Sequence, residues 1–251
     1  MCGRFVLAAP PAEVRNLFGY ADEPDFPPRY NIAPTQPIAT VRLEEGARRF
    51  RLVRWGLVPG WAKDPAALSL LVNARAETAA QKPSFRAAMR HRRCLVPASG
   101  YYEWYRPDTG QKVPYWIRPR DGGILALAGL WEDWCDPDGG VIDTGALLTV
   151  PANHALSGVH NRMPAVIRPE HFDLWLDVKN ASAKEVKALL RPLPDDFLEA
   201  IPVDTRVNAA RADDPGLIRE AEPEVAAPKP APRKRKTAGG GAPGGDQLDL
   251  F

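Results

Sequence analysis

The amino-acid sequence predicts a single α+β domain with a mostly antiparallel, curved sheet or open barrel, peripheral helices and a disordered C-terminal tail. Strand-like apolar segments follow one another between residues 94 and 150 without the regular helices that a βαβ alternation requires. The chain has 251 residues, of which 45% are hydrophobic and 25% charged, which suits one large core. The composition changes abruptly near residue 221, where apolar periodicity ends.

The elements can be placed by their local signals. Prolines, a three-to-four apolar spacing and a final glycine predict a helix over about residues 11–18. Two strands over 37–43 and 48–58 are joined through "EEGA". A helix over 82–90 precedes the consecutive strands near 94–97, 99–105, 113–118, 124–131 and 145–150, and helices are predicted over 168–176 and 182–190.

These signals divide the chain into three parts. Residues 1–221 form the folded domain. Residues 222–246 are rich in Pro, Ala, Gly and charge and form a disordered linker. Residues 247–251, "QLDLF", bring apolar side chains back at the end of that linker, as in a peptide that docks on a partner.

Several classes of protein are excluded by composition. No apolar run is long enough to span a bilayer and no signal peptide is present, so we expect a cytoplasmic, nucleoid-associated protein. The three cysteines form no CxxC pair and the four histidines no metal motif, so we expect no metal and no cofactor. The net charge of +2 is not that of a uniformly basic nucleic-acid binder. Arginines do cluster in "FRAAMRHRR" (85–93), either as a phosphate track or as a solvated helix face.

The N-terminal "MCGRF" is chemically unusual. Removal of Met1, normal before a small residue, would leave Cys2 with an α-amine and a thiol on one carbon framework. With ordinary pKa values of about 8 and about 8.5, both groups have a nucleophilic fraction at neutral pH. Such an aminothiol reacts with an aldehyde to give a Schiff base and then a thiazolidine ring. The alternative is that Cys2 is simply a small buried residue.

Three further stretches are polar where apolar residues are expected. "LLVNARAET" places Asn73, Arg75 and Glu77 after an apolar run. "ASGYYEWY" places Glu103 among aromatic residues, which raise the pKa of a carboxyl group and make it a proton shuttle. "GVHNRMP" places His160 and Arg162 in a loop. For each residue taken singly, a structural role is the favoured interpretation.

Together, the motifs resemble the SOS response-associated peptidase (SRAP) family. "MCGRF", "RYNIAPTQ", "RWGLVPGWAKD", "LVNARAET", "RRCLVPASGYYEW" and "GVHNRMPAVI" occur in this order, from residue 2 to about residue 210. The resemblance implies a β-rich α+β domain with a positively charged groove that links covalently to abasic (AP) sites in single-stranded DNA. It further implies roles for Cys2 as nucleophile, Asn73 as its positioning residue, Glu103 as acid/base and His160 as assistant.

The resemblance also implies contacts with DNA. Arg4, Arg75 and Arg162 occupy motif positions expected to meet phosphates, and aromatic residues are candidates to stack on bases: Trp55, Trp61, Tyr101, Tyr102 and Trp104. The implied enzyme is of the peptidase or hydrolase class, with suicide-type crosslinking, AP-lyase-like Schiff-base chemistry and self-processing of Met1. We expect a monomer. Two alternatives stay open, an N-terminal-nucleophile peptidase and a plain single-strand-binding module.

The tail resembles the short peptide by which bacterial polymerases and repair proteins dock on the β sliding clamp. Gln247 would bond at a pocket rim, while Leu248, Leu250 and Phe251 would fill an apolar cleft. We therefore expect the clamp as a partner.

Overall fold

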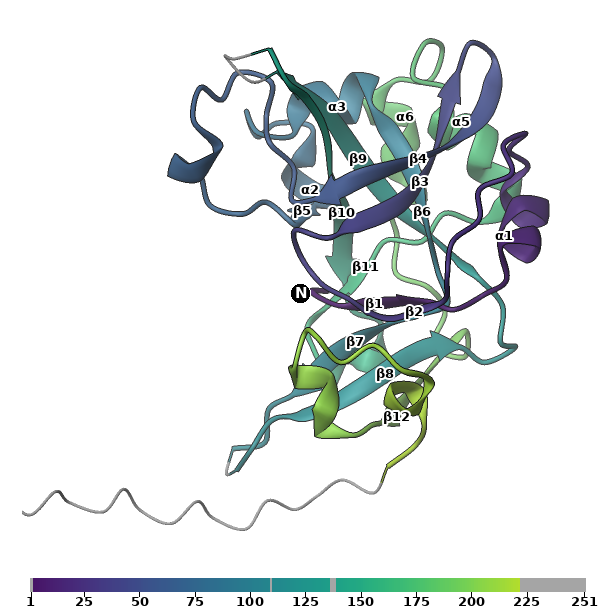
Figure 1. The fold of residues 1–251 in the computed structure, drawn as a ribbon, viewed down its shortest axis with the longest axis vertical. Helices are drawn as coiled ribbons and strands as arrows, with labels where there is room; N and C mark the ends of the chain where they lie inside the picture. The colour runs from purple at the N-terminus through teal and green to yellow at the C-terminus, as the bar shows by residue number, and fades with distance from the viewer. Residues whose placement is uncertain (1, 109, 136–138, 222–251) are drawn as a thin grey trace, which may run out of the picture.

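The computed structural model describes residues 2–108, 110–135 and 139–221, and its α+β class agrees with the prediction. Two sheets make up most of the domain (Figure 1). The smaller sheet has the strand order β12-β8-β7-β1-β2. Its strands are β1 (Phe5–Leu7), β2 (Arg29–Ile32), β7 (Gly100–Tyr105), β8 (Val113–Pro119) and β12 (Leu198–Pro202).

The larger sheet closes on itself as a barrel. Antiparallel pairing connects β4 to β3, β3 to β6, β6 to β9 and β9 to β10, and a short parallel pairing of Thr144–Gly145 with Arg54–Trp55 joins β10 back to β4. The expected curved sheet is thus a closed ring, and closure removes its free edges. Its strands are β3 (Pro37–Glu44), β4 (Ala47–Trp55), β6 (Arg93–Ala98), β9 (Leu125–Cys135) and β10 (Val141–Pro151).

Strand β10 also extends the barrel toward the smaller sheet. Short strands β5 (Asn73–Arg75) and β11 (Arg162–Pro164) pair with its second half, and Thr149 has Arg75 and Pro164 as its two register partners. Two segments almost ninety residues apart in the sequence are therefore held side by side.

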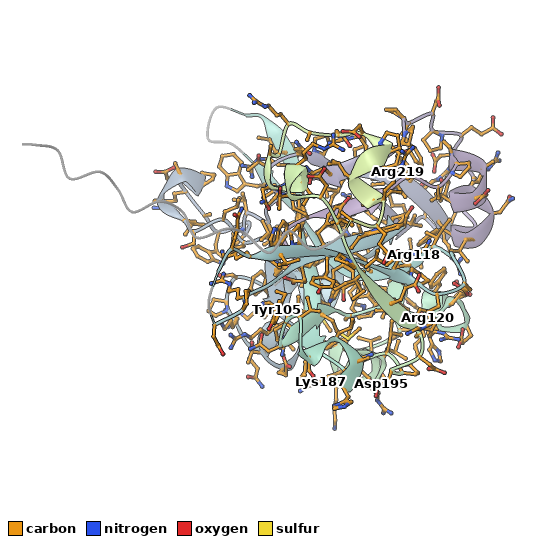
Figure 2. The ribbon with its side chains drawn as sticks, turned by 90° about the horizontal axis from the view of Figure 1, so that it is seen from below. Tyr105, Arg118, Arg120, Lys187, Asp195 and Arg219 are labelled. Atoms are coloured by element: carbon orange, nitrogen blue, oxygen red, sulfur yellow. The ribbon has the colours of Figure 1, made fainter. Side chains whose placement is uncertain are left out.

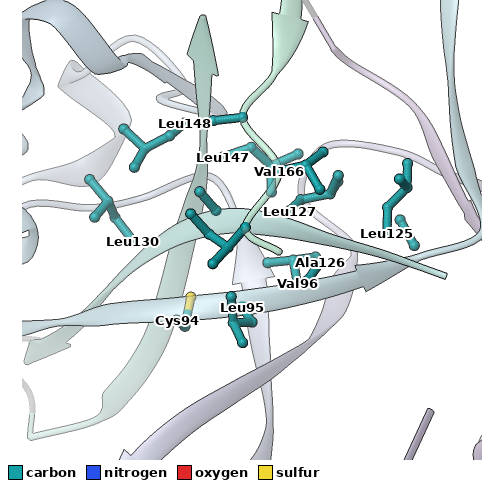
Figure 3. Close-up of a cluster of buried hydrophobic side chains, with 14 of the residues drawn as sticks. Cys94, Leu95, Val96, Leu125, Ala126, Leu127, Leu130, Leu147, Leu148 and Val166 are labelled. Atoms are coloured by element: carbon teal, nitrogen blue, oxygen red, sulfur yellow. The ribbon is translucent and has the colours of Figure 1, made fainter. Parts of the chain in front are cut away.

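The barrel is filled by aliphatic side chains. Figure 3 shows this cluster, in which Leu95 and Leu127 are fully buried. Small residues allow close packing: a Cβ on Gly129 would lie 2.7 Å from the sulfur of Cys94. Cys94 is therefore a core residue.

Short helices cover the sheets. They are α1 (Pro11–Phe18), α2 (Ala76–Ala79), α3 (Arg86–His91), α4 (His154–Ser157), α5 (Phe172–Leu176) and α6 (Ala183–Val186), with 3₁₀ turns at Pro65–Ala67, Pro169–His171, Lys187–Leu189, Thr205–Asn208 and Pro215–Ile218. Buried Arg93 joins several of them, because it donates hydrogen bonds to the main-chain carbonyls of Met89, Trp175, Asp177 and Ala181.

Most of the predicted elements are found with small changes of boundary. The helix over 11–18 has its expected limits, and Gly19 caps it with a left-handed φ of 67°. The hairpin turns through Glu45 and Gly46, both with positive φ. The segment predicted over 82–90 is an α-helix only over Arg86–His91. The segments predicted over 168–176 and 182–190 are found over 169–176 and 183–189, each partly α-helix and partly 3₁₀. The predicted linker and the predicted clamp-binding peptide lie outside the described residues. No helix in the described ranges is long and apolar enough to cross a membrane.

Candidate active site

Four separate segments meet where the two sheets adjoin. Cys2 precedes β1, and Glu103 lies on β7, which pairs with β1 through Phe5 and Tyr101. Asn73 begins β5, and His160 lies just before β11, so both are positioned by β10 of the barrel. A hydrogen bond joins the two sheets here, in which the Asn73 amide donates to the Cys2 carbonyl at 2.6 Å.

Cys2 is completely buried and is part of the main core cluster. Its sulfur lies 3.7 Å from the carbonyl oxygen of Arg4. Burial raises the pKa of the Cys2 thiol far above its usual range, and the negative charge of Glu103 raises it further. The direction of this shift differs from the ordinary thiol pKa that the sequence led us to expect. The Cys2 thiol therefore holds its proton more tightly than an exposed cysteine does.

Glu103 is 3% exposed, although it carries a carboxyl group. Alternation along β7 puts Tyr101 and Glu103 on one face and Tyr102 on the other, where Tyr102 joins a separate cluster and bonds the Tyr30 carbonyl. Burial raises the pKa of Glu103, and the charge of His160 acts in the opposite direction. The carboxyl group thus keeps its proton to higher pH than an ordinary glutamate, as its aromatic surroundings predict.

His160 faces Glu103, with 4.0 Å between Nδ1 and Oε1. The main-chain N–H of Arg162 donates to the same Nδ1 at 2.9 Å. With Nδ1 as acceptor, the proton of a neutral imidazole is on Nε2. The turn that carries His160 therefore sets both the orientation of the ring and its tautomer.

Arg162 is held by protein groups. Its two terminal nitrogens donate to both carboxylate oxygens of Glu77 at 2.6 and 2.9 Å, and one also donates to the Thr149 carbonyl at 2.5 Å. The bond with Arg162 lowers the pKa of Glu77. A phosphate at Arg162 would have to share it with this carboxylate.

The guanidinium group of Arg4 is also engaged within the protein. It donates to the Asn31 side chain and the Val207 carbonyl, both at 2.9 Å, and to the Asn208 carbonyl at 3.4 Å. Asn31 is fully buried. This geometry joins the start of the chain to its 205–208 turn, a role that the motif did not predict.

The other predicted DNA contacts differ in exposure. Arg75 is exposed and forms no ion pair within the described ranges. Trp104 is half-buried and donates its indole N–H to Asn208 at 2.7 Å. Of the other aromatic candidates, Trp61 is 59% exposed, whereas three are core residues and cannot stack on a base: Trp55, Tyr101 and Tyr102.

Several buried polar atoms around the site have no hydrogen-bond partner in the described part of the chain. They are Asn73 Oδ1, Thr78 Oγ1, Tyr101 Oη and Arg162 Nε. Buried polar groups are normally hydrogen-bonded, so each of these atoms has bonding capacity left for a ligand or for water. Sequence reasoning missed the Tyr101 hydroxyl group, because it considered this residue only as an aromatic ring that could stack on a base. Burial is the main cause that raises the pKa of the Tyr101 hydroxyl, and the charges of Cys2 and Glu103 raise it further.

Within the described ranges, no group of three or more His, Cys, Asp or Glu side chains is arranged to hold a metal ion. The described site offers an amide, a carboxyl group, an imidazole, a phenol and a thiol. Side chains of these types are capable of proton transfer and nucleophilic attack.

Comparison with known proteins identifies the family. Residues 1–210 match the model of the SOS response associated peptidase (SRAP) family. The chain belongs to this family. It is 37% identical to the abasic site processing protein YoqW of Bacillus subtilis, over 87% of this chain and 99% of that protein. It is 30% identical to the mouse abasic site processing protein HMCES, over 88% of this chain and 76% of that one.

Solved structures have the same SRAP-like fold. A crystal structure of a protein from Bacteroides thetaiotaomicron has a TM-score of 0.79 and 25% identity, over 88% of this chain and all of that one. A second, from Bordetella bronchiseptica, has a TM-score of 0.69 and 28% identity, over 81% and 100% of the two chains.

Proposed function

We propose that the protein processes abasic sites in single-stranded DNA by forming a thiazolidine between Cys2 and the aldehyde of the AP site. The observation that carries the proposal is the fixed position of Cys2, whose carbonyl is bonded by Asn73 at 2.6 Å beside the buried carboxyl group of Glu103. The names of the relatives support the substrate class.

The reaction begins with removal of Met1 and opening of the sugar. Protonated Glu103 donates to the ring oxygen as the C1′–O4′ bond breaks, and the C1′ hydroxyl group passes its proton to His160, which exposes the C1′ aldehyde. The α-amine of Cys2 adds to C1′ to give a carbinolamine. His160 returns that proton to the hydroxyl group of the carbinolamine, which leaves as one water and gives a protonated Schiff base.

Ring closure uses the thiol. The Cys2 sulfur bonds to C1′, and the electron pair of the C=N bond returns to nitrogen. Because burial raises the pKa of this thiol, the proton must leave during attack. Glu103, now a carboxylate, and His160, with 4.0 Å between them, are placed to accept it. The step is redox-neutral and needs no cofactor.

The strand itself requires contacts outside the reacting atoms. Exposed Arg75 follows Asn73 by two residues and suits a phosphate, and Trp61 and Trp104 offer accessible ring surface for bases. Phosphate contacts of this kind fix the register of the strand without reading its sequence.

The test is an SDS-stable adduct with a single-stranded oligonucleotide carrying one AP site. Wild type should give it, whereas Cys2→Ala, protein that retains Met1, and an oligonucleotide whose AP aldehyde has been reduced to the alcohol should not. Cys2→Ser keeps the amine and should give only a borohydride-trappable Schiff base and strand cleavage. An undiminished adduct with Met1 retained would refute the proposal.

Two other functions give different results in the same assay. A peptidase, which the family description suggests, would cleave an unrelated protein with multiple turnovers, whereas a crosslinker reacts once. A plain single-strand-binding module would bind the oligonucleotide equally well with Cys2→Ala and form no stable product.

We further propose that residues 247–251 dock on the β sliding clamp. The apolar "LDLF" ends a linker rich in Pro, Ala and Gly. Tethering would raise the local concentration of the domain where replication exposes single strands.

A further inference from the structure

The four arginines of "FRAAMRHRR" fall into two pairs. Arg93 is 2% exposed and bonds helix carbonyls, and Arg92 is paired with Glu132 at 3.1 Å and Asp133 at 2.9 Å. Arg86 and Arg90 are exposed, and neither forms an ion pair within the described residues. Contacts within the protein therefore explain only two of the four arginines in this motif.

Arg90 lines a groove of about 560 Å³ between the end of α3 and the segment 178–187. Small residues form much of the lining, which leaves the groove open. Its positively charged or titratable members are Arg90, His91, Lys179, Lys184 and Lys187, and its remaining members are Ala80, Val178, Asn180, Ala181, Ser182 and Ala183. The lining has no carboxylate.

The permanent cations of the groove, one arginine and three lysines, form no ion pair within the described ranges. The nearest carboxylates in sequence bond within their own turns. Asp177 accepts from the N–H groups of Lys179 and Asn180 and from the Asn180 amide, and Glu185 forms a capping box with Ser182. Hydrogen bonds within these turns are the main reason why the pKa of Asp177 and of Glu185 is lowered. A neighbouring cation is not the main reason for either acid. The groove therefore keeps a positive charge.

The groove is linked to the candidate active site by α2. Ala80, which lines the groove, caps the end of α2, and Asn73 lies seven residues earlier. Even a fully extended chain of this length spans only about 25 Å. Figure 1 shows α2 beside β5, with α3 beyond it. A strand of a few nucleotides can cover such a distance.

We propose that this groove binds the sugar-phosphate backbone of the DNA strand that reacts at Cys2. The inference rests on the proposed function and extends it from one nucleotide to the flanking strand. Clustered, unpaired cations beside a floor of alanines and a serine suit phosphates. The lining has no aromatic side chain on which a base could stack, so the contact is independent of sequence. An acidic peptide is the competing partner.

The test compares two double variants. Arg90→Gln/Lys187→Gln removes two groove cations, and Lys112→Gln/Arg219→Gln removes one arginine and one lysine elsewhere. Lys187 and Arg219 lie well apart in Figure 2. All four residues are exposed, so both variants should fold, which a thermal melt checks. Binding to AP-free single strands of about 6 and about 25 nucleotides is measured by fluorescence anisotropy over a salt series.

The groove variant should bind the long strand more weakly, and the slope of log K against log salt should fall by about 1.4, since each lost phosphate contact contributes about 0.7. Binding of the short strand and adduct formation with a short AP oligonucleotide should not change. An unchanged slope, an equal loss in the control variant, or displacement of the long strand by polyglutamate at equal charge would overturn the inference. Absence of any adduct in wild type would instead refute the proposed function and leave this measurement valid.

Discussion

At the scale of single residues, the proposed chemistry depends on Glu103, whose carboxyl group is buried in apolar surroundings. Glu103 is 3% exposed and its pKa is raised by burial. A buried acid of this kind destabilises the fold once it ionises, and such groups are common at functional sites, which supports the role proposed for Glu103.

Glu103→Gln should slow adduct formation by about 100-fold, the usual contribution of general acid/base catalysis. The wild-type rate should fall as the pH rises through the raised pKa, because the acid form is lost. The variant should lack this decrease. Single-turnover rates between pH 5 and 8 test this, with Glu13→Gln on the exposed face of α1 as a control. Equal rates for wild type and variant would remove Glu103 from the mechanism.

Although Glu103→Gln should slow the reaction, it should stabilise the folded state relative to wild type as the pH rises. A carboxyl group whose pKa is raised in the folded state contributes fully at low pH, and this contribution is lost as the pH rises through the folded value. The free energy of unfolding of Glu103→Gln should therefore increase relative to wild type between pH 5 and pH 8. Urea titrations at the two pH values measure the difference, and no change between them would contradict the assigned shift.

At the scale of elements, Arg93 of β6 determines how the helices attach to the barrel. It donates four hydrogen bonds to the carbonyls at the ends of α3 and α5 and before α6, and burial lowers its pKa to about 10. Its arginine neighbours in the sequence lack this role.

Arg93→Leu should lower the free energy of unfolding by about 4 kcal/mol, because several buried carbonyls lose a charged donor at once. Arg86→Leu, on the exposed side of α3, should change it by less than about 0.5 kcal/mol. Chemical denaturation of both variants gives the comparison, and equal effects would contradict the assigned role of Arg93.

Sequence reasoning succeeded where signals are local. Helix α1 follows from its prolines, its spacing and Gly19, and the β3–β4 hairpin follows from its alternating residues and Gly46. It did not foresee the closed barrel, because the parallel contact of β10 with β4 joins residues about ninety positions apart. For the same reason, the engagement of Arg162 by Glu77 and of Arg4 by Asn31 could not be predicted from motifs.

At the scale of the whole molecule, a folded domain precedes a segment of distinct composition. The match to the family covers residues 1–210, and "QLDLF" lies well beyond it. The tail proposal is therefore independent of the active-site proposal.

Deletion of residues 247–251 should abolish binding to purified β clamp and leave adduct formation on a free oligonucleotide unchanged. Surface plasmon resonance with immobilised clamp measures the first and gel analysis the second. Unchanged affinity of the truncated protein, or no binding by the full chain, would refute the docking peptide.

The central claim is that both the amine and the sulfur of Cys2 bond to one sugar carbon, and mass spectrometry of the adduct tests it most directly. The adduct should have the mass of the protein without Met1 plus the strand, less one water. After denaturation, iodoacetamide should alkylate Cys94 and Cys135 but not Cys2, and the DNA remnant should map to the peptide that begins at Cys2. An adduct on a lysine, or one in which Cys2 is still alkylated, would contradict the thiazolidine.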